Sequence, residues 1–175
     1  LLDKKIAYWK EKLDSVATLQ LPTDYKRPAV HSTRGSSVPF KIDKELSDQL
    51  HKLSKTEGTT LFITLQAVYK ALLYRYSGQS DISIGTSIAR REQEQLEGLI
   101  GFFVNTLALR DEVSGEPSFK ELLRQGRKPT MEAYEHQEVP FEKVEEVVIK
   151  EREQSASHLF QEMLVLKKKP ECTDM

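Results

Sequence analysis

The longest apolar stretch of the chain, residues 99–110, carries an asparagine near its centre. Its sequence, LIGFFVNTLALR, is rich in Phe, Val and Leu and is too short for the ~20 residues that cross a membrane, so it predicts a largely buried strand. The Asn105 amide has two N–H donors and an acceptor oxygen, and leaving them unpaired among apolar side chains costs about 1–3 kcal/mol. Two interpretations remain open: neighbouring backbone satisfies the amide, or the amide faces a polar cavity.

Length and charge limit the classes of protein to which the chain can belong. Its 175 residues suffice for one domain or for one lobe of a larger domain. Because 26 Lys and Arg residues balance 27 Asp and Glu residues, no basic excess indicates nucleic-acid binding. The single Cys172 cannot form an internal disulfide, which favours a reducing, cytoplasmic compartment, and no targeting peptide is visible. Since the first residue is Leu1, we expect the chain to be part of a longer protein.

Apolar residues recur at helical spacing in three segments of the first half: 2–13, the residues after Asp43, and 61–76. Asp43 is a suitable N-cap, and Gly58 and Gly78 are suitable residues for ending the second and third helices. The third helix is apolar around most of its circumference. We therefore expect it to be nearly enclosed, as the core helix of the fold.

Alternation of apolar and polar residues predicts further strands at 38–42, 81–89 and 159–166, followed by a polar tail at 167–175. A capping box at 118–121 begins another helix, in which Gly126 and Pro129 predict a kink. A last helix follows Pro140, with its apolar residues on one face. Helices and strands together predict an α/β fold.

The sequence contains no motif that indicates a complete catalytic site. The four histidines, at 31, 51, 136 and 158, lack metal-ligand spacing, and Cys172 has no cysteine partner, so we expect no metal site. There is also no glycine-rich phosphate loop and no nucleophile elbow. The chemistry of individual residues therefore leaves the function open.

A set of short motifs, taken in order, is more informative. These motifs resemble the C-terminal half of a non-ribosomal peptide synthetase condensation domain, and they are YWK at 8–10, LPTD at 21–24, LLYRYSGQSDI at 72–82, GT at 85–86, IGFFVNT at 100–106 and HQEVPFE at 136–142. The resemblance covers residues 1–166 in the order and spacing of the family. The catalytic HHxxxDG signature of the family is absent, and no two histidines are adjacent in this chain.

The resemblance implies one lobe of a two-lobed, chloramphenicol acetyltransferase-like fold, with a mixed central sheet and helices packed on it. A tunnel between the lobes would admit the phosphopantetheine arms of peptidyl carrier proteins. The implied partners are those carrier proteins, the missing N-terminal lobe and an adjacent adenylation domain, with neither nucleic acid nor membrane. No metal or directly bound cofactor is implied, and phosphopantetheine enters as part of the tethered substrates.

The resemblance also suggests substrate-binding positions in this lobe: Thr86, Asn105, Thr106 and His136, with no catalytic residue among them. Asn105 would orient an acceptor amine or a thioester carbonyl, or else bridge adjacent backbone. For His136, fixing the loop before the Pro140 helix is favoured over proton transfer. The chain departs from the family pattern at Ser87, at Arg90, at 126–129 and at 152–159.

The resulting hypothesis is that the chain supplies the wall and floor of a tunnel for amide bond formation and is inactive alone. Two alternatives are a non-catalytic module that docks a carrier protein or another synthetase domain, and a gene remnant without function. The amino acids that are joined and their stereochemistry are not readable from these residues.

Overall fold

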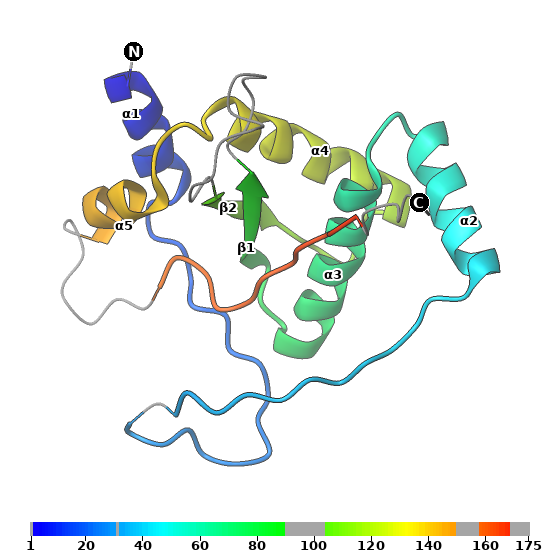
Figure 1. Ribbon diagram of the computed structural model, residues 1–175, viewed down its shortest axis with the longest axis horizontal. Coiled ribbons are helices and arrows are strands. Elements are labelled where there is room, and N and C mark those ends of the chain that lie inside the picture. Colours follow the sequence, from blue (N-terminus) through cyan, green and yellow to red (C-terminus); the bar gives the residue numbers. More distant parts are fainter. Residues whose placement is uncertain (1, 31, 90–103, 150–157, 169–175) are drawn as a thin grey trace, which may run out of the picture.

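The computed structural model describes residues 2–30, 32–89, 104–149 and 158–168. Within these residues the chain forms five helices and two strands (Figure 1). The elements in chain order are α1 (Leu2–Lys12), α2 (Lys44–Thr56), α3 (Leu61–Ser77), β1 (Asp81–Ala89), β2 (Val104–Glu112), α4 (Phe119–Glu135) and α5 (Phe141–Ile149). The predicted α/β class is confirmed.

A two-stranded antiparallel ribbon lies at the centre of the fold. β1 pairs with β2 along the full length of both strands, from Asp81 opposite Glu112 to Ala89 opposite Val104. The strand predicted at 81–89 is confirmed, and the strand predicted in 99–110 begins at Val104 and continues to Glu112. Residues 99–103, for which a strand was also predicted, lie outside the described residues.

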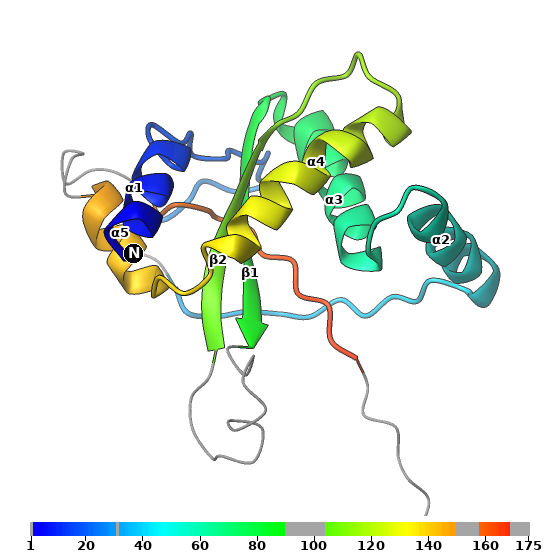
Figure 2. The same cartoon turned by 90° about the horizontal axis from the view of Figure 1, so that it is seen from above.

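Helices cover the ribbon from two sides, as Figure 2 shows. α1 and α5 pack together on one side, while α3 and α4 pack together on the other, with α4 lying across β2. A ribbon of two strands is marginal in water by itself, and three or more strands or helix packing are needed for stability. The core residues show this packing, because Ile84 and Leu109 face each other in the ribbon and are both almost completely buried.

The predicted helix ends are mostly confirmed. The Asp43 carboxylate accepts the backbone N–H of Leu46 at 2.8 Å, and the Ser118 and Glu121 side chains form the predicted capping box. Gly78 adopts the left-handed conformation at φ 70°, which ends α3. These signals are local in sequence, and this explains why they could be read without a structure.

The expectation that α3 is nearly enclosed is wrong. Val68, Leu72 and Tyr76 form an apolar stripe whose members are 44%, 48% and 65% exposed. The face of α3 that turns inward carries the polar residues Gln66 and Lys70, both 2% exposed. Apolar residues therefore occupy an outward face of this helix while polar residues occupy part of the core.

The strand predicted at 38–42 is not formed. Val38 and Phe40 are 86% and 84% exposed, and the segment has no ladder partner among the described residues. Alternation predicts a strand only when another backbone edge is available to pair with it. In the described residues, β2 occupies one edge of β1 and the segment around Met163 occupies part of the other.

The last predicted strand, 159–166, is reduced to a single parallel bridge between Gly85 and Met163. The Gly85 N–H donates to the carbonyl oxygen of Glu162, and the Leu164 N–H donates to that of Gly85, both at 2.9 Å. A Cβ atom on residue 85 would lie 2.5 Å from the Phe160 ring, so the close approach depends on glycine. The predicted mixed sheet thus consists of the antiparallel ribbon and this one parallel bridge.

α4 continues through Pro129 as one helix. Proline removes the N–H that would bind the carbonyl oxygen of Gln125, but Leu123 and Ala133 are buried on either side of it. Burial of this face holds the helix together across the proline. The predicted kink stays a prediction.

Most of residues 152–159 and 167–175, together with Arg90, His31 and Cys172, lie outside the described residues.

Replacing Gly126 by alanine should stabilise the chain, because alanine lowers the backbone entropy cost of a helix interior. The nearest neighbour of the added Cβ would be a carboxylate oxygen of Asp111 at 3.8 Å, an ordinary contact. We expect Gly126→Ala to raise the free energy of unfolding by about 0.5–1 kcal/mol in urea denaturation.

Gly78→Ala is the matched control for this substitution. A Cβ atom there meets open space, but the backbone has φ 70°, which disfavours an L-residue side chain. We expect Gly78→Ala to lower the free energy of unfolding by about 1 kcal/mol. Destabilisation of similar size in both variants would contradict the assignment of residue 126 to an unstrained helix interior.

Candidate functional site

Asn105 lies on β2, is 5% exposed, and is fully engaged with the loop between α4 and α5. Its Nδ2 atom donates to the carbonyl oxygens of Gln137 and Val139 at 2.9 and 3.0 Å. Its Oδ1 atom accepts the backbone N–H of Phe141 at 3.0 Å. Of the two interpretations of this amide, the contacts show the one in which neighbouring backbone satisfies it.

His136 lies at the C-terminal end of α4 and joins that helix to α1. Its ring stacks on the ring of Tyr8, with centroids 3.8 Å apart and planes 13° from parallel. Its Nδ1 atom is 2.7 Å from the carbonyl oxygen of Glu132, and its own carbonyl oxygen accepts the Trp9 indole N–H at 3.0 Å. Because a carbonyl only accepts, Nδ1 carries a proton in this arrangement, leaving Nε2 as the acceptor of the neutral ring.

The two threonines lie on opposite faces of the ribbon. Thr86 is buried and stands opposite Leu107, so its side chain shares a face with Asn105. Thr106 is half-buried and stands opposite Ser87, on the other face. The structure therefore connects Asn105 and His136 through the 136–141 loop, and it separates Thr106 from Thr86 and Asn105 by the thickness of the ribbon.

An open, polar pocket of about 900 Å³ lies where the ends of α1, α4 and β2 meet. Of the four positions suggested by the sequence, only His136 lines it. Six carboxylates and two cations accompany Tyr8 and His136 around this pocket: Glu11, Asp81, Asp111, Glu112, Glu132 and Glu135, with Lys12 and Arg110. Burial, together with the negative charges of Glu132, Glu135 and Asp111, raises the pKa of Tyr8 to about 12.

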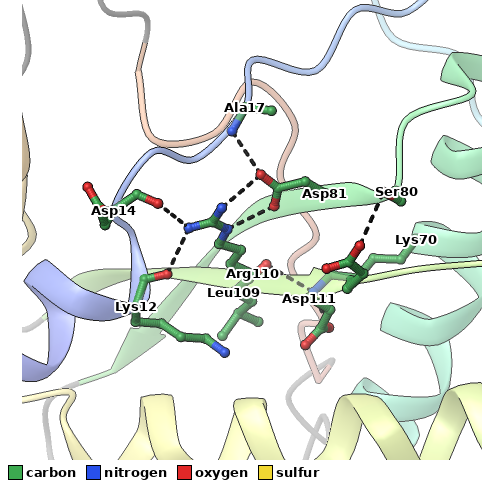
Figure 3. A network of polar contacts seen from close by, with 10 residues as sticks. Lys12, Asp14, Ala17, Lys70, Ser80, Asp81, Leu109, Arg110 and Asp111 are labelled. Carbon is green, nitrogen blue, oxygen red and sulfur yellow. Dashed lines mark hydrogen bonds and ion pairs between the residues drawn. The ribbon is translucent and has the colours of Figure 1, made fainter.

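Arg110 is the central residue of the network drawn in Figure 3. Its Nε and Nη2 atoms bind the two carboxylate oxygens of Asp81 at 2.8 and 2.9 Å, in a bidentate pair. Its Nη1 atom donates to the carbonyl oxygens of Lys12 and Asp14, and Asp81 also accepts the backbone N–H of Ala17. One guanidinium group therefore holds the end of α1 against the start of β1.

A second ion pair, between Lys70 of α3 and Asp111 of β2, is buried between that helix and that strand (Figure 3). The Lys70 ammonium also donates to the carbonyl oxygen of Leu109 at 2.9 Å. Burial lowers the pKa of Lys70, while the Asp111 carboxylate opposes that change. Sequence reasoning missed this pair, although the interruption of the apolar pattern of α3 by a lysine was a visible signal.

Within residues 2–30, 32–89, 104–149 and 158–168, no group of three or more His, Cys, Asp or Glu side chains is arranged to hold a metal ion. Two carboxylates of the polar pocket bind cationic side chains instead, Asp81 to Arg110 and Asp111 to Lys70. Over the same ranges, none of the helices has the length and apolar character needed to span a membrane.

Comparison with known proteins assigns the family. The family model for the condensation domain matches residues 1–172, nearly the whole chain. The chain belongs to the condensation domain family. The predicted resemblance to condensation domains is thereby confirmed.

Condensation domain relatives of this segment occur in very large synthetases. A linear gramicidin synthase polypeptide of Brevibacillus parabrevis is 51% identical over 171 residues, which are 97% of this chain and 3% of that protein. The dimodular nonribosomal peptide synthase of Bacillus subtilis (strain 168) is 41% identical over 172 residues, 98% of this chain and 7% of that protein. The chain thus spans a small fraction of the curated relatives that it matches.

Solved structures of condensation domain relatives share the fold. The X-domain from teicoplanin biosynthesis superposes with a TM-score of 0.84 at 30% identity, over 93% of this chain and 36% of the other. A four-domain nonribosomal peptide synthetase bound to AMP and glycine superposes with a TM-score of 0.87 at 27% identity, over 97% of this chain and 13% of the other. The acyltransferase-like fold class predicted from the sequence is confirmed.

The Asn105 cross-tie, the three hydrogen bonds from this side chain to the 137–141 loop, predicts a large effect on the stability of this condensation domain segment. Asn105→Ala removes these hydrogen bonds and leaves two carbonyl groups and one N–H without their partner, so we expect the free energy of unfolding to fall by about 2–4 kcal/mol. Thr106→Ala, at the next position but on the opposite face, should cost less than about 1 kcal/mol. Equal, small losses in chemical denaturation would contradict the cross-tie.

Proposed function

We propose that residues 1–166 form the C-terminal lobe of a condensation domain, with 167–175 as a polar tail. The complete domain would join two carrier-tethered aminoacyl or peptidyl thioesters through an amide bond. The observation that carries this proposal is that the family match extends along residues 1–172, while the chain covers 36% of the X-domain chain. The absence of adjacent histidines from the sequence supports assigning the catalytic histidine motif to the other lobe.

The chemistry of the proposed reaction separates positioning from proton transfer. The acceptor amine attacks the donor thioester carbonyl, the new C–N bond forms as the C–S bond breaks, and the phosphopantetheine thiol leaves while the amine loses a proton. Holding two tethered reactants in line replaces a bimolecular encounter and is worth ~7–11 kcal/mol of barrier in favourable systems. We assign this positioning task, and no proton transfer, to the present chain.

Each sequence-suggested position has a place in this proposal. Asn105 acts through the 137–141 loop, since its amide is engaged by three backbone groups of that loop. His136 keeps α1 in place through its stacking on Tyr8. Thr86 and Thr106 remain proposed substrate-binding positions, but they lie on opposite faces of the ribbon, so only one of them can face a given tunnel.

The proposed partners follow from the same role. They are peptidyl carrier proteins that present phosphopantetheine arms, the N-terminal lobe of the domain, and a neighbouring adenylation domain. The similarity to a four-domain nonribosomal peptide synthetase supports this multidomain setting. The single cysteine supports a reducing, cytoplasmic location.

The isolated chain should form no amide product with acylated donor and aminoacylated acceptor carrier proteins. Wall residues cannot replace the histidine that we assign to the other lobe, and positioning both substrates needs both lobes. The measurement is mass spectrometry of the carrier-bound products after incubation with the purified chain. Product formed by the chain above the rate without protein would overturn the proposal.

The same preparation separates the proposed role from that of an autonomous docking module. Fluorescence titration with labelled holo-carrier protein should show no saturable binding, because the proposed tunnel mouth needs both lobes. Saturable binding without amide formation would favour a docking module over a catalytic lobe. The control is a circular dichroism spectrum that shows the chain to be folded, because an unfolded preparation would also be inactive.

A further inference from the structure

A small cavity of about 140 Å³ lies between α3, α4 and β2, and it adjoins the polar pocket, with which it shares Lys12, Asp111 and Glu112. Its lining includes Gln66 and Lys70 from α3, Asp111 from β2, and Gln125 and Pro129 from α4. Apolar side chains, among them Ile63 and Leu122, complete the wall. The lining of the cavity is thus mostly apolar but includes both hydrogen-bond donors and hydrogen-bond acceptors.

Gln66 is 2% exposed and cannot satisfy its amide with the described residues alone. The Thr130 hydroxyl lies 3.0 Å from Gln66 Oε1 and 2.8 Å from the carbonyl oxygen of Gly126. A hydroxyl has one hydrogen, so Thr130 donates to only one of these two oxygens. Whichever way the Gln66 amide is oriented, one of its two polar atoms lacks a partner among the described residues.

The Lys70–Asp111 ion pair contributes the complementary groups. Asp111 binds Lys70 through Oδ2, whereas its Oδ1 atom is buried and has no partner among the described residues. The Lys70 ammonium has three N–H donors, of which two are directed to the carbonyl oxygen of Leu109 and to Asp111. The cavity therefore has a carboxylate acceptor beside an ammonium donor.

Pro129 adds another acceptor to the same wall. Since proline has no backbone N–H, the carbonyl oxygen of Gln125 lacks the donor that a helix normally supplies from four residues further along the chain. Both residues line the cavity. The cavity beside this proline is large enough to contain another hydrogen-bond donor.

We propose that this cavity is a binding site for ordered water, which bridges the Gln66 amide to the Asp111 carboxylate of the buried ion pair. A bound water needs ~10–15 Å³ and two to four polar partners, so the cavity has room for more than one. Water both donates and accepts, as this mixed lining requires. The Asp111 carboxylate disfavours a bare anion, and the adjacent Lys70 ammonium disfavours a metal cation. This inference is independent of the proposed function.

The test is nuclear magnetic resonance of the 175-residue chain, with selective observation of magnetisation transfer from water to the side-chain amide protons of Gln66. We expect cross-peaks with the sign of a long-lived bound water, together with ordered density in the cavity of a crystal structure. Absence of both in the wild-type chain would overturn the site. Density of an ion or organic molecule in place of water would also overturn it.

A pair of variants locates the water. Gln66→Met keeps the length of the side chain and removes the amide, so magnetic relaxation dispersion should count at least one long-lived water fewer than in the wild type. Ser54→Ala is the matched control, because Ser54 is similarly buried but its hydroxyl is already paired with Thr64 and Leu50, away from the cavity. An unchanged count in folded Gln66→Met, or an equal loss in Ser54→Ala, would contradict the assignment.

Discussion

The attachment of β2 to the rest of the chain is the constraint on which the fold depends. A two-stranded ribbon has little stability of its own, so both of its faces and both of its ends need partners. β2 supplies three of the fixing groups: Asn105 near one end, and Arg110 and Asp111 near the other. Asn105 holds the loop before α5, Arg110 holds the end of α1, and Asp111 holds α3 through Lys70. Apolar packing then fills the space that these polar contacts define.

This arrangement fits the proposed positioning role, which depends on geometry. The 136–141 loop is fixed from two directions, by the Asn105 amide and by the Trp9 and Tyr8 contacts of His136. A loop held by buried hydrogen bonds keeps its shape, which is what the proposed positioning role requires. The polar side chains that fix this loop are thus engaged in structural contacts.

Much of the fold could be predicted from the sequence, because caps and helix stops such as Asp43 and Gly78 act over a few residues. The buried asparagine could also be recognised as needing partners. Its partners could not be identified, because the carbonyl oxygens that it binds are 32 and 34 positions away. The strands predicted at 38–42 and 159–166 failed for a related reason, since alternation describes a strand's faces but not the edge with which it pairs.

The most direct measurement of the central claim uses a complete condensation domain. The segment of the linear gramicidin synthase polypeptide that is 51% identical to this chain is replaced by residues 1–166. Single-turnover amide formation by the hybrid is then followed with loaded carrier proteins. We predict that the folded hybrid forms the amide bond, because the chain provides a competent wall for the lobe that carries the catalytic histidine. A hybrid that is folded and binds carrier proteins but forms no amide would contradict this role.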